Sequence, residues 1–282
     1  GKKTWFGSGG NSKLFFSINN RKTLQTLIKF IPNKIPLLVL GSGSNILIRD
    51  GGFKGLTIKL GKSFSFINFQ KKNMILEIGS AAKDSEVSKF CYENSISGFE
   101  FLKGIPGTIG GNIAMNAGCY GSVISDLLLS CQILTKEGKI KELKRDEIKF
   151  SYRKTSIKKN AIILSAKFFA KKGIKRNIAQ KLKEISSNRV LSQPVSSRTG
   201  GSTFKNPPNE SAWKLIEKIN YRGRRLGGAL VSKHHTNFMI NDSLASSLDI
   251  ELLGEEIREK VWQKFKINLD WEIKRVGKYK KI

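Results

Sequence analysis

The chain has 282 residues and a formal net charge of +29, because 51 Lys and Arg outnumber 22 Asp and Glu. Hydrophobic residues make up 39% and no long polar tract occurs, which excludes a largely disordered chain. The longest uncharged apolar runs fall short of the ~20 residues that a membrane-spanning helix needs, and the amino terminus lacks the apolar segment of a secretory signal. We therefore expect a cytoplasmic protein without a membrane span.

Short strands and helices alternate along the first 172 residues. Residues 23–30 have an amphipathic pattern typical of a helix, and the loop Gly41-Ser-Gly-Ser-Asn45 leads into a strand. A further helix is predicted at residues 84–94. Strands are predicted at residues 35–40, 46–48, 56–60, 64–69, 74–78, 130–134, 140–143 and 161–169. The pattern predicts an α+β unit that ends near residue 172.

A second composition begins near residue 189, after a lysine-rich segment that predicts a helix. We expect one helix capped by Ser211 and another that follows Asp249, and residues 269–276 predict a closing strand. Apolar residues at helical spacing predict the buried face of the last helix. They are Ile250, Leu253, Ile257 and Val261.

Two glycine loops suggest a bound anion. The Gly41 loop lacks the third glycine of the dinucleotide fingerprint GxGxxG, and a strand follows it, yet its backbone N–H groups can still form an anion-binding nest. The stretch from Gly104 to Gly121 holds six glycines in 18 residues. Either loop alone is also typical of an ordinary corner in a β unit, but two in one unit favour a dinucleotide held by both.

Five motifs in chain order carry a resemblance to a known family. They are Leu40-Gly-Ser-Gly-Ser-Asn-Ile-Leu-Ile-Arg-Asp50, Gly104-Ile-Pro-Gly-Thr-Ile-Gly-Gly111, Ser151-Tyr-Arg153, Gly201-Ser-Thr-Phe-Lys-Asn-Pro207 and Asp270-Trp-Glu-Ile-Lys-Arg-Val-Gly277. Together they resemble the UDP-N-acetylenolpyruvoylglucosamine reductases over nearly the whole chain. Residues 7–12 depart from the family's usual pattern, which leaves the turn there open.

The resemblance implies an α+β protein with an FAD-binding unit of the vanillyl-alcohol-oxidase (PCMH) type. This unit would cover residues 1–172, in subdomains of about 1–62 and 63–172, and an α+β substrate-binding domain would cover residues 190–282. The implied reaction reduces UDP-N-acetylenolpyruvoylglucosamine to UDP-N-acetylmuramate, a peptidoglycan precursor, with NADPH as co-substrate and non-covalent FAD. Only residues 154–201 lie between Arg153 and Ser202, so the resemblance is to a shorter subgroup without a tyrosine-bearing lid.

The resemblance also assigns site residues. Arg153, Ser202 and Glu272 would be catalytic, and Tyr152, Asn206 and Lys233 would contact substrate. FAD would be held by Gly41, Ser42, Gly43, Ser44, Asn45, Ile46, Thr108, Gly111 and Gly118. The trio suits the chemistry, because a guanidinium can pair with the substrate carboxylate while a hydroxyl, helped by a carboxyl, donates a proton.

We expect no metal site. Cys91, Cys119 and Cys131 lack metal or redox spacing, and Cys119 is expected to be a packing residue. His234 and His235 are adjacent, and on a strand their side chains would point apart.

Two other functions stay open. One is another flavoenzyme of this fold, such as an oxidase or dehydrogenase of alcohols, and the other is a basic nucleic-acid-binding module. The lysines are dispersed along the chain, so we expect the charge to reflect composition, solubility or steering of anionic ligands, with no dedicated nucleic-acid function. We expect a monomer.

Overall fold

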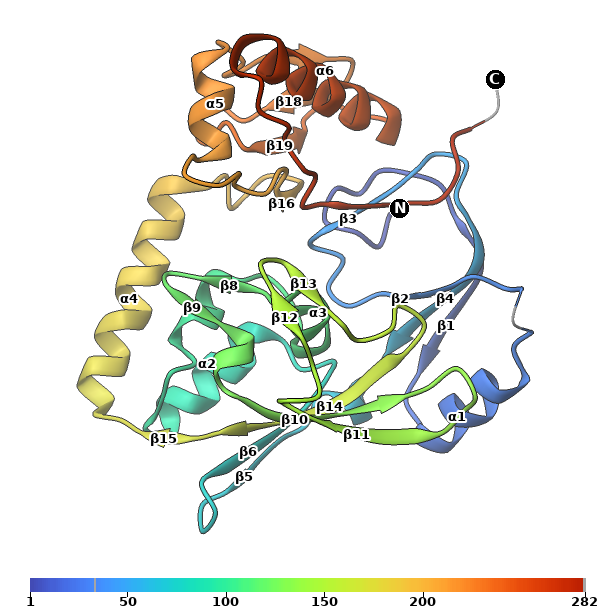
Figure 1. Ribbon diagram of the computed structural model, residues 1–282, viewed down its shortest axis with the longest axis vertical. Coiled ribbons are helices and arrows are strands. Elements are labelled where there is room, and N and C mark those ends of the chain that lie inside the picture. The colour runs from blue at the N-terminus through green and yellow to red at the C-terminus, as the bar shows by residue number, and fades with distance from the viewer. Residues whose placement is uncertain (33, 281–282) are drawn as a thin grey trace. The chain divides into compact units, whose positions relative to one another are not determined.

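A computed structural model describes residues 1–32 and 34–280 (Figure 1). The backbone contacts divide the chain into two compact units. We call residues 14–42 and 55–188, which contain five of the nine residues expected to hold FAD, the flavin unit, and residues 1–13, 43–54 and 189–282 the carboxyl-terminal unit. The predicted domain bounds stay a prediction.

The helices and strands are short and follow one another closely. The helices are α1 (Arg21–Phe30), α2 (Asp84–Glu93), α3 (Ile109–Met115), α4 (Lys175–Ser192), α5 (Ala212–Lys218) and α6 (Ser247–Phe265), with 3-10 turns at Lys62–Phe64, Glu100–Gly104 and Ile124–Asp126. The strands are β1 (Ser12–Ile18), β2 (Leu37–Val39), β3 (Ile46–Ile48), β4 (Phe53–Leu60), β5 (Ile67–Gln70), β6 (Ile75–Gly79), β7 (Ile96–Ser97), β8 (Gly118–Cys119), β9 (Ser122–Val123), β10 (Leu128–Leu134), β11 (Ile140–Lys144), β12 (Phe150–Ser151), β13 (Lys154–Thr155), β14 (Ile162–Phe169), β15 (Lys171–Lys172), β16 (Thr199–Ser202), β17 (Arg225–Leu226), β18 (Ala229–Val231), β19 (Phe238–Asn241) and β20 (Lys274–Val276).

A five-stranded antiparallel sheet in the order β11-β10-β14-β6-β5 organises the flavin unit. Its central strand β14 is apolar on both faces, as expected for a strand with packing on each side. Ile163 joins the core that contains Val87 of α2 and Ile113 of α3, whereas Ile162 and Leu164 join a second core with α1. Helices α2 and α3 therefore cover one face of this sheet (Figure 1).

A smaller sheet, β1-β4-β2, lies beside the second core. Helix α1 contributes Leu24 and Ile28, and Asn20 begins it by accepting a hydrogen bond from the Thr23 N–H. Strand β2 pairs in parallel with β4 and ends two residues before Gly41, and the backbone N–H of Leu40 donates to the Ile58 carbonyl. The first glycine loop thus leaves a fixed sheet edge.

The carboxyl-terminal unit contains the sheet β16-β19-β18-β17, which packs with α5 and α6 around one apolar core. The predicted apolar face of α6 is confirmed, since Ile250, Leu253, Ile257 and Val261 are fully buried. Strand β20 pairs in parallel with β3, so the closing motif runs beside the strand that follows the first glycine loop.

Three predicted elements need correction. Helix α6 begins at Ser247, two residues before Asp249, because Ser246 and Asp249 form a capping box at its start. The closing strand is limited to Lys274–Val276. The glycine-dense stretch contains helix α3, which was not predicted because glycine has a low helix propensity.

Within the residues that the structure describes, no helix is long and apolar enough to span a membrane.

Candidate functional site

The two glycine loops of the flavin unit approach each other at Gly41 and Thr108. A Cβ atom placed on Gly41 would lie 2.7 Å from Thr108 Oγ1, closer than side-chain carbons approach oxygen. Thr108 is buried and immediately precedes α3. The structure therefore brings these two predicted cofactor residues together, and it explains why position 41 lacks a side chain.

The second glycine loop is held against residues 80–84. Gly110 N–H donates to the Ser80 carbonyl at 2.8 Å and Ile109 N–H donates to the Ala82 carbonyl at 3.1 Å, while Thr108 forms a β-bridge with Lys83. These backbone bonds lay the loop along a neighbouring segment. Gly111 follows in the first turn of α3 and is exposed, so its backbone is accessible to a ligand.

Sequence reasoning missed Asp84, which is 1% exposed at the start of α2. Its carboxyl accepts hydrogen bonds from Gly107 N–H at 2.9 Å and from Asn112 Nδ2 at 2.7 Å. Burial raises the pKa of Asp84 to about 8, against the lowering effect of these two bonds. An acidic residue in the first turn of a helix is common, so no local signal marked it.

Gly118 and Cys119 form β8, which pairs with β9 in a tight hairpin. A Cβ on Gly118 would lie 2.4 Å from the Ser122 carbonyl oxygen, so the hairpin itself requires glycine there. Cys119 is partly buried, and its Sγ donates to the Phe101 carbonyl at 3.2 Å. These contacts suit a packing role, which is what the sequence predicts for Cys119.

The flavin unit contains buried polar atoms that a dinucleotide could satisfy. The hydroxyl of Ser80 and the side-chain oxygen Oδ1 of Asn116 are buried without a hydrogen-bond partner among the described residues. Ser80 lies against Gly110, whose Cβ would be 2.8 Å from the Ser80 Cβ. Buried polar atoms beside bare backbone are the groups that a phosphate or ribose would satisfy.

Tyr152 and Arg153 form the two-residue turn of the β12–β13 hairpin, in which Ser151 pairs with Lys154. Arg153 has φ +54°, a left-handed conformation that is uncommon outside glycine, and its guanidinium lies 5.1 Å from the Tyr152 ring centroid. Asn116 Nδ2 donates to the Ser151 carbonyl at 3.2 Å. The hairpin that carries the predicted catalytic arginine is thus tied to the end of α3.

The first glycine loop belongs to both units, since Gly41 and Ser42 lie in the flavin unit and the loop continues in the carboxyl-terminal unit. Gly43 has φ +72°, and its carbonyl accepts from Trp5 N–H at 2.9 Å. Asn45 Nδ2 donates to the Glu272 carbonyl at 3.2 Å, and Lys274 N–H donates to the Asn45 carbonyl at 3.1 Å. The loop is therefore fastened to the closing motif before Ile46 starts β3.

Ser202 ends β16 and lies opposite Phe238. The next residue, Thr203, accepts a backbone hydrogen bond from Glu272 N–H at 2.8 Å. Gly201 has φ +79°, and its Cβ position would lie 3.8 Å from the Ser44 carbonyl oxygen. The structure thus places Ser202 and Glu272 on adjoining backbone segments with Ser44 nearby.

Trp271 anchors the backbone next to Glu272. Its ring packs 5.1 Å from Phe204 and 4.4 Å from the Arg275 guanidinium, and its Nε1 donates to Glu255 Oε1 at 2.8 Å. Burial alone would raise the pKa of Glu255, but hydrogen bonds, that from Trp271 first, hold this pKa below its usual range. An ionised Glu255 on α6 therefore fixes the tryptophan.

Asn206 has a structural contact that the sequence did not reveal. Its Oδ1 accepts from Ala212 N–H at 3.0 Å, whereas Ser211 stands at the cap position of α5 without a capping bond from its side chain. Ser211 is therefore the N-cap residue, as predicted, but its side chain makes no capping bond, and Asn206 satisfies the first N–H of the helix instead. Lys233 is exposed, and its backbone carbonyl accepts from the Arg222 guanidinium.

His234 and His235 lie in the loop between β18 and β19. His235 Nδ1 accepts from Asn237 N–H at 3.2 Å, and its ring packs 4.8 Å from Phe238. Burial lowers the pKa of His235, so its ring is a neutral packing group. The described part of the chain contains no cluster of His, Cys, Asp or Glu arranged to hold a metal.

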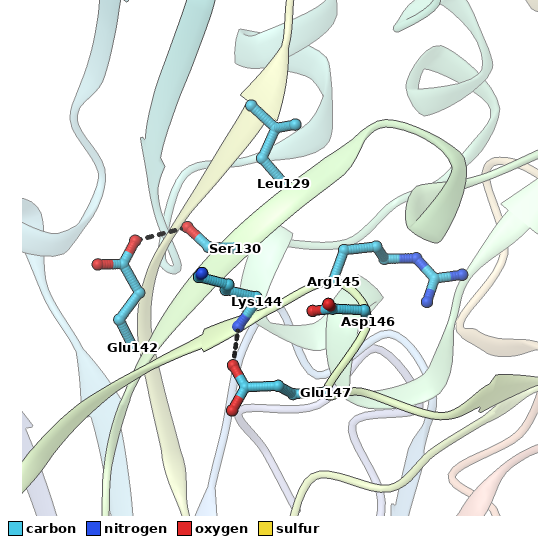
Figure 2. A pocket seen from close by; sticks show the side chains of 7 residues that line it. All are labelled: Leu129, Ser130, Glu142, Lys144, Arg145, Asp146 and Glu147. Carbon is cyan, nitrogen blue, oxygen red and sulfur yellow. Dashed lines mark hydrogen bonds between the residues drawn. The ribbon is translucent and has the colours of Figure 1, made fainter.

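A hollow of about 800 Å³ lies elsewhere on the flavin unit, against β10 and β11 (Figure 2). Its polar side chains bond to one another and to the backbone: Ser130 donates to Glu142 at 2.6 Å, and Glu147 accepts from Lys144 N–H at 2.7 Å. None of the predicted site residues lines it. It is therefore distinct from the predicted flavin and substrate positions.

Comparison with known proteins covers both units. The family model "UDP-N-acetylenolpyruvoylglucosamine reductase, C-terminal domain" matches residues 193–276, and "FAD binding domain" matches residues 12–144. The chain is 45% identical over 276 residues to the UDP-N-acetylenolpyruvoylglucosamine reductase of Rickettsia massiliae (strain Mtu5), covering 98% of this chain and 93% of that relative. It is 46% identical to that of Rickettsia typhi (strain ATCC VR-144 / Wilmington), with the same coverage.

A solved structure agrees. The crystal structure of UDP-N-acetylenolpyruvylglucosamine reductase from Thermus caldophilus superposes with a TM-score of 0.85 at 27% identity, covering 98% of this chain and 96% of that chain. The predicted fold class, α+β with a PCMH-type FAD-binding unit and a further carboxyl-terminal domain, is confirmed. The chain belongs to the UDP-N-acetylenolpyruvoylglucosamine reductase family of oxidoreductases with an FAD-binding domain.

Proposed function

We propose that the chain is the NADPH-dependent, FAD-mediated reductase that converts UDP-N-acetylenolpyruvoylglucosamine to UDP-N-acetylmuramate during peptidoglycan precursor synthesis. We further propose that it acts in the cytoplasm as a monomer. The observation that carries the proposal is the 45% identity to a curated reductase along 98% of the chain, and the five motifs of this sequence follow one another in order. The backbone bonds that join the Asn45, Thr203 and Glu272 segments support it.

FAD would supply the one chemical capacity that no side chain here has, since it can take a hydride from NADPH and pass it to a carbon atom. The chain's own contribution is to hold it. In the flavin unit Gly111 has an exposed backbone at the start of α3, and Ser80 offers a buried hydroxyl. Gly41, Thr108 and Gly118 are the other residues of this unit that are proposed to line FAD. The segment from Gly43 to Ile46 would complete the set.

Arg153 is proposed to hold the substrate carboxylate. Hydride addition to the methylene carbon leaves negative charge on the neighbouring carbon and its carboxylate. A planar guanidinium that pairs with both carboxylate oxygens stabilises this charge. The left-handed backbone at Arg153 and the ring of Tyr152 fix the direction of the side chain, so less conformational freedom is lost when substrate binds.

Ser202 is proposed to donate the proton that completes the reduction. A hydroxyl is a weak acid, so it needs a partner, and Glu272 on the adjoining segment is the proposed one. Lys233 has an exposed ammonium group that suits a phosphate of the nucleotide. Asn206, whose Oδ1 accepts from Ala212 N–H, is proposed to contact substrate as well.

The alternative flavoenzyme activities are separated by the electron acceptor. The purified protein should absorb between about 350 and 500 nm, the flavin region, and NADPH should bleach this absorbance without oxygen. We expect rapid recovery of the absorbance with UDP-N-acetylenolpyruvoylglucosamine and none with simple alcohols or their aldehydes. Absence of flavin from the purified protein would refute the proposal, as would flavin absorbance that does not recover faster when the enolpyruvyl substrate is added.

A further inference from the structure

Asp84 is a buried carboxyl group that the proposed reaction does not use. It lies at the first residue of α2 and is 1% exposed. A buried carboxyl costs stability unless its oxygens are hydrogen-bonded. Both of its oxygens here have partners, and both partners belong to the second glycine loop and the helix that follows it.

The first partner, Gly107, is bonded in both directions. Its N–H donates to Asp84 Oδ2 at 2.9 Å, and its carbonyl accepts from the Asp84 backbone N–H at 3.3 Å. A Cβ on Gly107 would lie 2.6 Å from Oδ2, so the carboxyl can reach the backbone because residue 107 is glycine. The fit of Asp84 to this backbone is therefore close and specific.

The second partner, Asn112, lies in α3. Its Nδ2 donates to Asp84 Oδ1 at 2.7 Å, and the side chain is 2% exposed. One carboxyl group thus holds both ends of residues 107–112. Between these ends lie Thr108, which faces Gly41, and Gly111, which is exposed at the start of α3.

We propose that Asp84 is a positioning residue that fixes residues 107–112 in the conformation that binds FAD. The inference rests on the proposed FAD site and adds a residue to it. Glycine-rich backbone loses much conformational entropy on ordering. If Asp84 orders the loop before FAD binds, the entropy cost of ordering does not weaken FAD binding. If only a fraction of the apoprotein has the loop in the binding conformation, the apparent Kd for FAD rises by the inverse of that fraction.

The test measures FAD affinity without any turnover. Apoprotein is titrated with FAD and binding is followed by the quenching of flavin fluorescence. Asp84→Ala leaves the Gly107 N–H and the Asn112 amide without their acceptor, and we expect FAD affinity to fall about 10- to 100-fold. Asp84→Asn keeps an acceptor for Gly107, and its amide can donate to Asn112 once the Asn112 amide turns over, so affinity should stay within about threefold of the parent.

Ser88→Ala is the matched control. Ser88 is buried on the same helix, but among the described residues its hydroxyl donates to the Ser85 carbonyl within α2 and to no part of the glycine loop. This variant should lower thermal stability slightly and leave the Kd for FAD unchanged. A rise in Kd equal to that of Asp84→Ala would show that general loosening of α2 is responsible, and the positioning role would be wrong.

A second variant decides the matter if Asp84→Ala does not fold, as judged by circular dichroism. Asn112→Ala removes one of the two clasps, and we expect about a 3- to 10-fold loss of FAD affinity. Unchanged affinity in the folded variant overturns the proposal. A parent protein that binds no FAD would instead overturn the proposed function, so the two failures are distinguishable.

Discussion

The contact between Gly41 and Thr108 predicts that a substitution at position 41 destabilises the protein and that a second substitution at position 108 restores stability. Gly41→Ala places a carbon 2.7 Å from Thr108 Oγ1, whereas ordinary contacts begin at about 3.4 Å, so the Thr108 side chain or one of the loops must shift by about 0.7 Å. Overpacking of this kind typically costs about 1–3 kcal/mol. We expect the apoprotein to lose stability by that amount and the Kd for FAD to rise at least tenfold, because the two loops separate.

Thr108→Ala removes the atom that the new methyl group would meet. The double variant Gly41→Ala/Thr108→Ala should therefore recover most of the lost stability, and a double-mutant cycle should give a coupling free energy of about 1 kcal/mol or more. Chemical unfolding of the four apoproteins measures this. Effects that add independently would mean that the loops do not touch and that the geometry proposed here is wrong.

Three further predictions concern single side chains. Burial raises the pKa of Asp84 to about 8, while the pKa of an Asp in the unfolded chain is ~3.9. The parent should therefore lose stability relative to Asp84→Asn as pH rises from about 4 to about 8, and lose no more above pH 8. Thermal unfolding across this range tests the prediction, and a stability difference between the two proteins that does not change with pH would contradict it. Trp271, the residue before Glu272, loses its hydrogen bond to Glu255 in the variant Trp271→Phe. Stopped-flow absorbance should show that reoxidation of the flavin by substrate slows about 3- to 10-fold while its reduction by NADPH is unchanged. Equal slowing of both half-reactions would count against a positioning role for Trp271. The Cys119 Sγ donates to the Phe101 carbonyl, so we expect no covalent bond between Cys119 and the flavin. Acid precipitation should release all the yellow colour, and colour left in the protein pellet would reveal such a bond.

The sequence predicts well those elements whose periodicity is strong. The helix expected at residues 84–94 is Asp84–Glu93, and the pair of strands expected at 64–69 and 74–78 is the β5–β6 hairpin. The apolar face of α6 was equally clear, because packing of such a face provides most of the stability of a helix. Local pattern and tertiary structure agree at these positions.

Elements that depend on distant partners could not be predicted in the same way. Helix α3 contains two glycines, which weaken helix propensity, and it is held by the bond from Asn112 to Asp84, 28 residues away. The Asn206 cap of α5 lies six residues before the N–H that it accepts, outside the usual capping pattern. The loop position of His235 depends on packing against Phe238 and Trp213.

The candidate site divides along the same line. The motifs located Ser202, Glu272 and Arg153, because they can be matched residue by residue to a family. The residues that support them, such as Glu255 behind Trp271 and Asn116 behind the β12–β13 turn, belong to no motif and act through contacts that only the fold creates. Identification of such residues needs coordinates.

The most direct test of the account follows both half-reactions of Ser202→Ala in the absence of oxygen. The substitution removes a hydroxyl from a partly buried residue whose backbone pairing with Phe238 does not depend on it. Ser8→Ala is the matched control, since it removes a buried hydroxyl that donates to the Ala245 carbonyl in the same unit, and both of its half-reactions should match the parent.

Stopped-flow absorbance of the Ser202→Ala flavin should show reduction by NADPH at a near-parental rate. Reoxidation by UDP-N-acetylenolpyruvoylglucosamine should be slower by about 10² to 10⁴, the contribution of a positioned general acid, and Ser202→Cys should restore part of it. Equal loss of both half-reactions, or reoxidation at the parental rate, would contradict the assignment of Ser202 as the proton donor.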